Sequence, residues 1–228
     1  MPRSGARRVL TGYYTAAIVL IVGWRGSSAV GLKLTGPALA DLTIPIQTAR
    51  LTLRAFTADD VDAVHEYQSL PEVARYQYWQ PRSRDEVAVE VAKWAEPDGP
   101  PEAPVSLVFA VTLKDGGALI GDTVLLFRDW EARQGEIGFS FNPAYAGQGY
   151  ATEAAAALLR IGFEHFNLHR MFGRCDARNE RSWRLMQRLG MRREAHFREH
   201  ALFKGEWDEE FYYAMLSREW ADLVRDEA

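Results

Sequence analysis

The sequence predicts an α+β (mixed α/β) fold in which helices flank a mostly antiparallel sheet. Apolar and polar residues alternate in about seven strand-like runs, several of them joined by short glycine-containing turns. Between these runs, apolar residues recur at helical spacing. One helix separates two strands in the middle of this order, so the sheet and the helices are expected to pack as layers of one domain.

The first half of the domain is predicted to be one strand followed by helices. Apolar residues alternate with polar ones in ARLTLRAF, which predicts a strand over 49–56. Thr57 with Asp60 three residues later is a helix-capping pattern, and Ser83 precedes another acidic first turn. The predicted helical segments are 57–70, 71–79 and 83–96, and the cluster PDGPPEAP ends this part of the chain.

The second half is predicted to alternate strands and helices. SLVFAVTLK and ALIGDTVLLF flank the turn DGG as a hairpin, and GEIGFSFNP forms the next strand. REAHFREHALF and DEEFYYAML flank KGEW as a second hairpin, which a polar terminal helix follows. The elements between the two hairpins are a helix over 152–167, a strand over 169–178 and a helix over 179–191 that ends near Gly190.

Composition and charge restrict the class of protein. The chain has 228 residues, of which 47% are hydrophobic and 25% charged, as in globular domains. Its net charge is -4, but residues 1–48 carry five basic groups and one acidic group, which leaves the rest at -8. An acidic body argues against nonspecific nucleic-acid binding. Because Cys175 is the only cysteine, the chain has no internal disulfide; we predict a reducing, cytoplasmic location and no metal.

Residues 1–48 are predicted to be an extension and linker, with the working domain at 49–228. Basic residues precede the apolar stretch YYTAAIVLIVGW, which has the outline of a signal-peptide core but is short for a membrane span. Three alternatives remain open for this region. It is a signal or membrane anchor, an extra helix or strand that docks on the domain, or an upstream extension produced by a misassigned start.

The stretch AYAGQGYATEA places two glycines between a predicted strand and a predicted helix. Helix N-termini present unpaired N–H groups and the positive end of the dipole, and glycine lets a ligand approach the backbone closely. A phosphate or pyrophosphate site is therefore one interpretation of Gly147 and Gly149; the other is that they only shape a loop. The stretch is neither a Rossmann fingerprint nor a P-loop, since it lacks the third glycine and a GK[ST] sequence.

Four separated segments, in this order, resemble the GNAT superfamily of acyl-CoA-dependent N-acetyltransferases. They are RLTLRAFTADD, GQGYATEA, NERSWRLMQRLGM and FKGEWDEEFYYAML. They look most like the branch of bacterial enzymes that acetylate the N-terminal alanine or serine of ribosomal proteins. The resemblance covers Ala49 to about Trp220. It implies a splayed sheet of about seven strands, acetyl-CoA as co-substrate and an amine as acceptor.

The resemblance also implies which residues bind coenzyme A. The strand main chain would hold the pantetheine arm, the glycine loop the pyrophosphate, and the next helix start the sulfur end. In this sequence the matching residues are Phe139, Ser140, Phe141, Gly147, Gln148, Gly149, Tyr150, Ala151, Thr152, Asn179 and Ser182. The loop departs from the family pattern at Ala146, where an Arg or Gln is expected. Binding is therefore expected to depend on main-chain donors.

Acetyl transfer to an amine requires a neutral nucleophile, donors for the oxyanion and a proton for the leaving thiolate. We expect Glu136 to be the general base, acting directly or through water, although it alternates out of phase with Phe139 and Phe141 and would share their face only with a bulge. The alternatives in the last hairpin are Glu199, His200, Glu206 and Asp208.

The acid of the broad superfamily is a tyrosine whose position here holds Met186, which cannot donate a proton. The narrower branch instead suggests that Ser182 protonates or hydrogen-bonds the sulfur of coenzyme A. The alternative is that Asn179 or Ser182 only caps its helix.

The sequence thus predicts an N-acetyltransferase that acts by direct transfer in a ternary complex. The expected acceptor is a peptide or protein N-terminal α-amine, with aminoglycoside- or polyamine-type small amines as the alternative. The aromatic segments 66–68, 75–79 and 210–215 are expected to line the acceptor groove or to pack in the core. A non-catalytic acyl-CoA-binding module is the other class of protein left open, and the oligomeric state is left open with a homodimer as one alternative.

Overall fold

The computed structural model describes residues 39–99 and 103–226, which belong to one compact unit that begins at Leu34. The predicted signal, docking or upstream segment around 13–24 lies outside the described residues. Within the described residues 39–48 the chain forms the 3₁₀ turn Leu39–Asp41 and strand β1, Ile46–Gln47. Leu39, Leu42 and Ile46 pack against the main core, so this part of the chain contributes to the domain's packing.

Eight strands form one sheet in the order β1-β2-β3-β4-β5-β6-β8-β7, and only the β5–β6 pair is parallel. This confirms the predicted mixed α/β class with a mostly antiparallel sheet, with β1 as a strand too short to be seen in the sequence pattern. The other strands are β2 (Leu51–Arg54), β3 (Ser106–Leu113), β4 (Leu119–Asp129), β5 (Gln134–Phe141), β6 (Arg170–Asp176), β7 (Arg192–Phe203) and β8 (Glu206–Leu216).

The helices begin where the capping patterns predict. Ser83 accepts a hydrogen bond from the Glu86 amide in a capping box, and Pro71 occupies the first turn of α2. The helix predicted over 71–79 ends at Ala74, because the following residues turn toward the sheet. The helices are α1 (Val61–Gln68), α2 (Pro71–Ala74), α3 (Arg84–Trp94), α4 (Tyr150–Arg160, continued by a π-helical turn to His165), α5 (Glu180–Arg188) and α6 (Ser217–Asp226).

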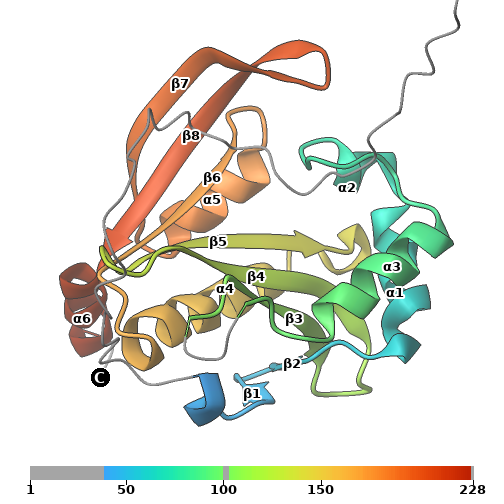
Figure 1. Ribbon diagram of the computed structural model, residues 1–228. Coiled ribbons are helices and arrows are strands. Elements are labelled where there is room, and N and C mark those ends of the chain that lie inside the picture. The colour runs from blue at the N-terminus through green and yellow to red at the C-terminus, as the bar shows by residue number, and fades with distance from the viewer. Residues whose placement is uncertain (1–38, 100–102, 227–228) are drawn as a thin grey trace, which may run out of the picture. The chain divides into compact units, whose positions relative to one another are not determined.

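Helices cover both faces of the sheet, as Figure 1 shows. Buried residues of α1 and α3 pack with Ala110 of β3 in one cluster. Residues of α4, α5 and α6 pack with Phe109 and Val111 of the same strand in a second, larger cluster. Because neighbouring strand residues point to opposite sides, the two clusters lie on opposite faces. We call these the α1 face and the α4 face.

The sheet splays between β5 and β6. The two strands pair only at their starts, where Gln134–Glu136 face Arg170–Phe172. Beyond that point β5 continues beside β4, whereas β6 continues beside β8, and Figure 1 shows the two halves of the sheet diverging. Among the described strands none pairs with residues 137–141 on the β6 side. Their main-chain groups on that side are therefore available to a ligand.

Residue parity along β5 decides which side chains share a face. Ile137 is buried in the α4-face core, and Phe139 and Phe141 pack against it. Glu136 and Ser140 therefore point to the α1 face, since the pairing of β5 with β4 is regular from Gly135 to Phe141. The predicted base and the aromatic rings lie on opposite faces, and no bulge brings them together.

Candidate active site

The glycine loop has a backbone that requires glycine at two positions. Gly147 and Gly149 have φ angles of 80° and 81°, in the left-handed region that other residues adopt only with strain. Gly149 directly precedes α4, so the first amides of the helix, starting with Tyr150, face the loop without intrahelical acceptors. The residues from Ala146 to Gly149 are exposed. The arrangement fits an anion at the helix N-terminus.

Arg50, at the start of β2, brings a guanidinium to this loop from a distant part of the chain. Its Nη1 donates to the main-chain oxygen of Gln148 at 2.9 Å, and its Nε donates to Glu153 of α4 at 2.7 Å. The guanidinium also lies over the Tyr150 ring, 4.6 Å from its centroid. The sequence has Ala146 where the family pattern has an Arg or Gln. The contact of Arg50 with this loop was not predicted, because no local pattern links residues about a hundred positions apart.

Ser182 and Asn179 begin α5 beside β6. Asn179 is the N-cap, and its side chain accepts a hydrogen bond from the Ser182 amide at 3.3 Å. The Ser182 hydroxyl is therefore not the helix cap. Burial raises the pKa of the nearby Cys175 thiol to about 12, and the Ser182 side chain opposes the rise. Cys175 is thus held as an unreactive neutral thiol next to the hydroxyl.

Glu136 is held between two arginines at the point where the sheet splays. Its Oε2 accepts from Arg128 Nε at 2.7 Å, and its Oε1 accepts from Arg174 Nε at 2.9 Å. The carboxylate is only 7% exposed. Both oxygens are engaged, so the side chain is fixed in position on the α1 face.

Arg174 links Glu136 to a second buried carboxylate, Glu210 of β8. Arg174 Nη1 lies 3.8 Å from Glu210 Oε1, and the Tyr78 hydroxyl lies 3.4 Å from the same oxygen. Glu210 Oε2 is buried without a hydrogen bond, and its nearest ion-pair partner is His200 Nε2 at 3.4 Å. Burial raises the pKa of Glu210, although Arg174 and His200 oppose the rise.

His200 lies between two acids, since its Nδ1 is 3.1 Å from Asp208 Oδ1. We call Glu136, Arg174, Glu210, His200, Asp208 and Tyr78 the polar cluster. Among the residues that the structure describes, no group of three His, Cys, Asp or Glu side chains is arranged to hold a metal ion.

The segment after α2 crosses the splay on the α1 face. Gln77 Nε2 donates to the Ser140 hydroxyl on β5 at 3.3 Å, while the next residue, Tyr78, reaches Glu210 on β8. Two consecutive residues thus contact the strands on either side of the opening. We call the segment 75–79, to which they belong, the roof; it spans the splay on the α1 face, and its Tyr78 joins it to the polar cluster.

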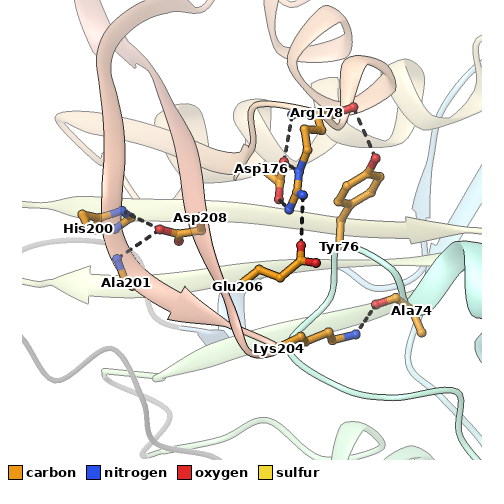
Figure 2. A network of polar contacts seen from close by, with 9 residues as sticks. All are labelled: Ala74, Tyr76, Asp176, Arg178, His200, Ala201, Lys204, Glu206 and Asp208. Carbon is orange, nitrogen blue, oxygen red and sulfur yellow. Dashed lines mark hydrogen bonds and ion pairs between the residues drawn. The ribbon is translucent and has the colours of Figure 1, made fainter.

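Hydrogen bonds join the β7–β8 hairpin to this roof and to the end of α2 (Figure 2). Lys204, in the hairpin turn, donates to the main-chain oxygens of Ala74 at 2.7 Å and Trp79 at 2.8 Å. The Tyr76 hydroxyl donates to the Arg178 main-chain oxygen at 3.4 Å. Arg178 in turn bridges to Glu206 at 3.4 Å at the base of the turn. These contacts join the hairpin to the segment that crosses the splay.

Two of the aromatic segments that were predicted to line the acceptor groove or to pack in the core lie in different places. The segment 75–79 forms the roof. Tyr67 and Gln68 are instead buried in the α1-face core, where the Tyr67 hydroxyl donates to Asp122 at 2.5 Å. Of the alternative bases, Glu206 pairs with Arg178 and Glu199 is exposed. Arg174 and the burial of Glu210 were not predicted from the sequence. Residue parity places these two side chains on the same face only once the pairing of β6 with β8 is known.

Comparison with known proteins defines the class. A family model described as "Acetyltransferase (GNAT) domain" matches residues 50–192, and the chain belongs to this family of N-acetyltransferases. It is 37% identical to the "Uncharacterized N-acetyltransferase YnaD" of Bacillus subtilis over 77% of this chain and 98% of that protein. A GNAT-family acetyltransferase structure from Bacillus anthracis is 36% identical and superposes with a TM-score of 0.68, over 76% of this chain and 99% of that one.

Two further similarities are to acetyltransferases whose names state an acceptor. The "[Ribosomal protein uS5]-alanine N-acetyltransferase" of Escherichia coli is 27% identical over 84 residues, 37% of this chain and 43% of that protein. A spermidine N-acetyltransferase from Vibrio cholerae, solved with CoA and spermine, shares the fold at a TM-score of 0.65 and 22% identity, over 76% of this chain and 99% of that one. Among the described residues, no helix is both long and apolar enough to span a membrane.

Proposed function

We propose that this chain transfers the acetyl group of acetyl-CoA to the α-amine of a peptide or protein N-terminus, in the cytoplasm and by direct attack. Acetyl transfer to an amine is the activity of the family to which the chain belongs. The observation that carries the proposal is the splay itself. It opens beneath a roof and faces buried carboxylates on the α1 face.

Coenzyme A would lie in the splay with its pyrophosphate at the glycine loop. The main chain of 137–141, including Phe139, Ser140 and Phe141, has no strand partner on the β6 side and would hydrogen-bond the pantetheine arm. The amides from Gly147 through Gln148, Gly149, Tyr150 and Ala151 to Thr152 would hold the pyrophosphate. Arg50 stabilises the loop through its bond to the Gln148 carbonyl. Asn179 caps the helix whose first turn would bring Ser182 to the sulfur.

The chain's residues then supply the proton transfers. The amine nitrogen attacks the thioester carbonyl carbon, the carbonyl electron pair moves to oxygen, and collapse breaks the carbon–sulfur bond. The Ser182 hydroxyl would hydrogen-bond the departing sulfur. Glu136, the base proposed from the sequence, and Glu210 are the two buried carboxylates of the polar cluster that could take the ammonium proton.

An α-amine of a peptide is favoured as the acceptor by two observations. The partial similarity to a ribosomal-protein-alanine acetyltransferase concerns such an amine. The carboxylates of the polar cluster suit an incoming ammonium group. A polyamine or another small amine is the second candidate, because the same carboxylates would attract it and a spermidine acetyltransferase shares the fold.

An acceptor screen with acetyl-CoA tests the proposal. Peptides beginning with Ala, Ser or Met, spermidine and an aminoglycoside would be incubated with the full chain and analysed by mass spectrometry. We expect acetylation of a peptide α-amine, lost or strongly reduced in Glu136→Gln and Ser182→Ala while coenzyme A binding is retained. Faster acetylation of spermidine would identify a small-amine enzyme. Coenzyme A binding without transfer to any amine would identify a non-catalytic module.

A further inference from the structure

Glu210 is the buried acid of the polar cluster whose surroundings leave one oxygen available. It is 6% exposed, and among the described residues its Oε2 has an ion-pair partner, His200, but no hydrogen bond, whereas both oxygens of Glu136 are bound by arginines. A buried carboxylate oxygen without a hydrogen bond is costly to maintain. Such an atom is expected where a ligand donor, here an ammonium group, completes the site.

Glu210 also lies where an acceptor amine would arrive. The adjacent roof residues Gln77 and Tyr78 contact Ser140 and Glu210 respectively, so two consecutive residues link the strand that carries Ser140 to the strand that carries Glu210. Ser140 is in the strand segment that lacks a partner on the β6 side. A donor thioester held there and an amine held by Glu210 would meet beneath the roof.

His200 and Asp208 connect Glu210 to solvent. His200 Nε2 lies 3.4 Å from Glu210 Oε2, and Nδ1 lies 3.1 Å from Asp208. The His200 side chain is 36% exposed, so a proton that reaches its ring can leave to water. Asp208 also accepts from the Ala201 amide, which fixes its orientation toward the ring (Figure 2).

We propose that Glu210 is the proton acceptor for the incoming ammonium group, that His200 and Asp208 pass this proton to solvent, and that Glu136 is a positioning residue that holds Arg174. The proposal rests on the proposed acetyl-transfer function. The ammonium proton moves to Glu210 and on through His200, which leaves a neutral amine. The nitrogen–carbon bond then forms and the carbon–sulfur bond breaks. The nitrogen loses a second proton, and the departing thiolate gains one, so the products are the amide and the free thiol.

The charged and titratable groups around Glu210 come from every strand packed against it. They are Glu136 on β5, Arg174 and Asp176 on β6, His200 on β7, Asp208 and Tyr212 on β8, and Tyr78 of the roof. Burial raises the pKa of Glu210, although Arg174 and His200 oppose the rise, and a raised pKa makes it a stronger base than an exposed carboxylate. Arg174, which Glu136 holds in place, opposes this rise.

Steady-state kinetics over a pH series would test this assignment with the peptide that the wild type acetylates fastest. Glu210→Gln is expected to lower kcat/KM at pH 6.5 by about a hundredfold or more, as for loss of a general base. The loss should shrink to several-fold above pH 8, because α-amines deprotonate unaided near pH 8. Glu136→Gln should lower activity while the wild-type pH profile keeps its shape. The dissociation constant for coenzyme A should stay within about twofold in both variants.

Glu209→Gln is the matched control, since Glu209 is the exposed neighbour of Glu210 and pairs with His196 instead. It should retain both activity and pH profile. The assignment is overturned if Glu210→Gln keeps the wild-type profile, or if its loss is equal at all pH values. It is also overturned if Glu136→Gln, rather than Glu210→Gln, removes the pH-dependent limb. A wild type that acetylates no amine overturns the proposed function together with this assignment.

Discussion

Replacing Gly149 by Val perturbs the glycine loop, which we propose binds coenzyme A, through backbone conformation alone. Gly149 has φ 81°, and an added Cβ would approach only Arg50 Nη2, at an ordinary 3.5 Å. The left-handed conformation costs an L-residue about 1–2 kcal/mol, and a β-branched side chain is the least tolerant of it. The loop is exposed, so it can relieve this strain by changing its own conformation. That change would turn the first amides of α4 away from the pyrophosphate.

A free-energy loss of this size corresponds to a rise of about 5- to 30-fold in the dissociation constant of coenzyme A. Isothermal titration calorimetry on the full chain would measure it. Gly116→Val is the matched control, because Gly116 has φ 80° with no heavy atom within 4 Å of an added Cβ, in the β3–β4 turn. It should retain wild-type affinity. Unchanged affinity in Gly149→Val, or an equal loss in the control, would refute the reasoning that these amides hold the ligand.

Two further predictions concern the α1 face. Burial raises the pKa of Asp122 to about 6 from an ordinary 3.8, so the stability it contributes is complete below pH 4 and is lost as pH rises through 6. Asp122→Asn should therefore gain about 3 kcal/mol relative to wild type between pH 4 and pH 7.5 in urea unfolding, and parallel pH curves would contradict this. Lys204→Met removes both hydrogen bonds that the Lys204 side chain donates from the hairpin turn, to the main-chain oxygens of Ala74 and Trp79. It should raise KM for the peptide several-fold without changing the affinity for coenzyme A. Equal effects on both ligands would show that the contact serves general stability.

Most of the fold could be predicted from local sequence patterns. The capping box at Ser83, the alternation in β3 and β4 and the glycine turn between them each depend on neighbouring residues, which a sequence displays directly. Strand β1 was missed because two residues are too few for an alternating pattern. The splay was expected only through the family resemblance, since no residue pattern states where two strands stop pairing.

The site was less accessible to sequence reasoning than the fold. Gly147 and Gly149 suggested the loop, and their positive φ angles give the physical reason for two glycines. The polar cluster, in contrast, depends on β8 lying between β6 and β7, which sets Glu210 beside Arg174 and opposite His200. Neither the pairing order nor the burial of Glu210 can be deduced from the spacing of charges. Arg50 reaches the loop for the same reason, through tertiary contact alone.

The most direct test of the central claim is mass spectrometry of a peptide with an N-terminal alanine after incubation with acetyl-CoA and the full chain. We predict addition of one acetyl group at the α-amine. The peptide should remain unmodified when its α-amine is already blocked, even if it contains lysine. Coenzyme A binding with no acetylation of this peptide, or of any amine in the panel, would contradict the claim that the splay and the polar cluster form an acetyl-transfer site.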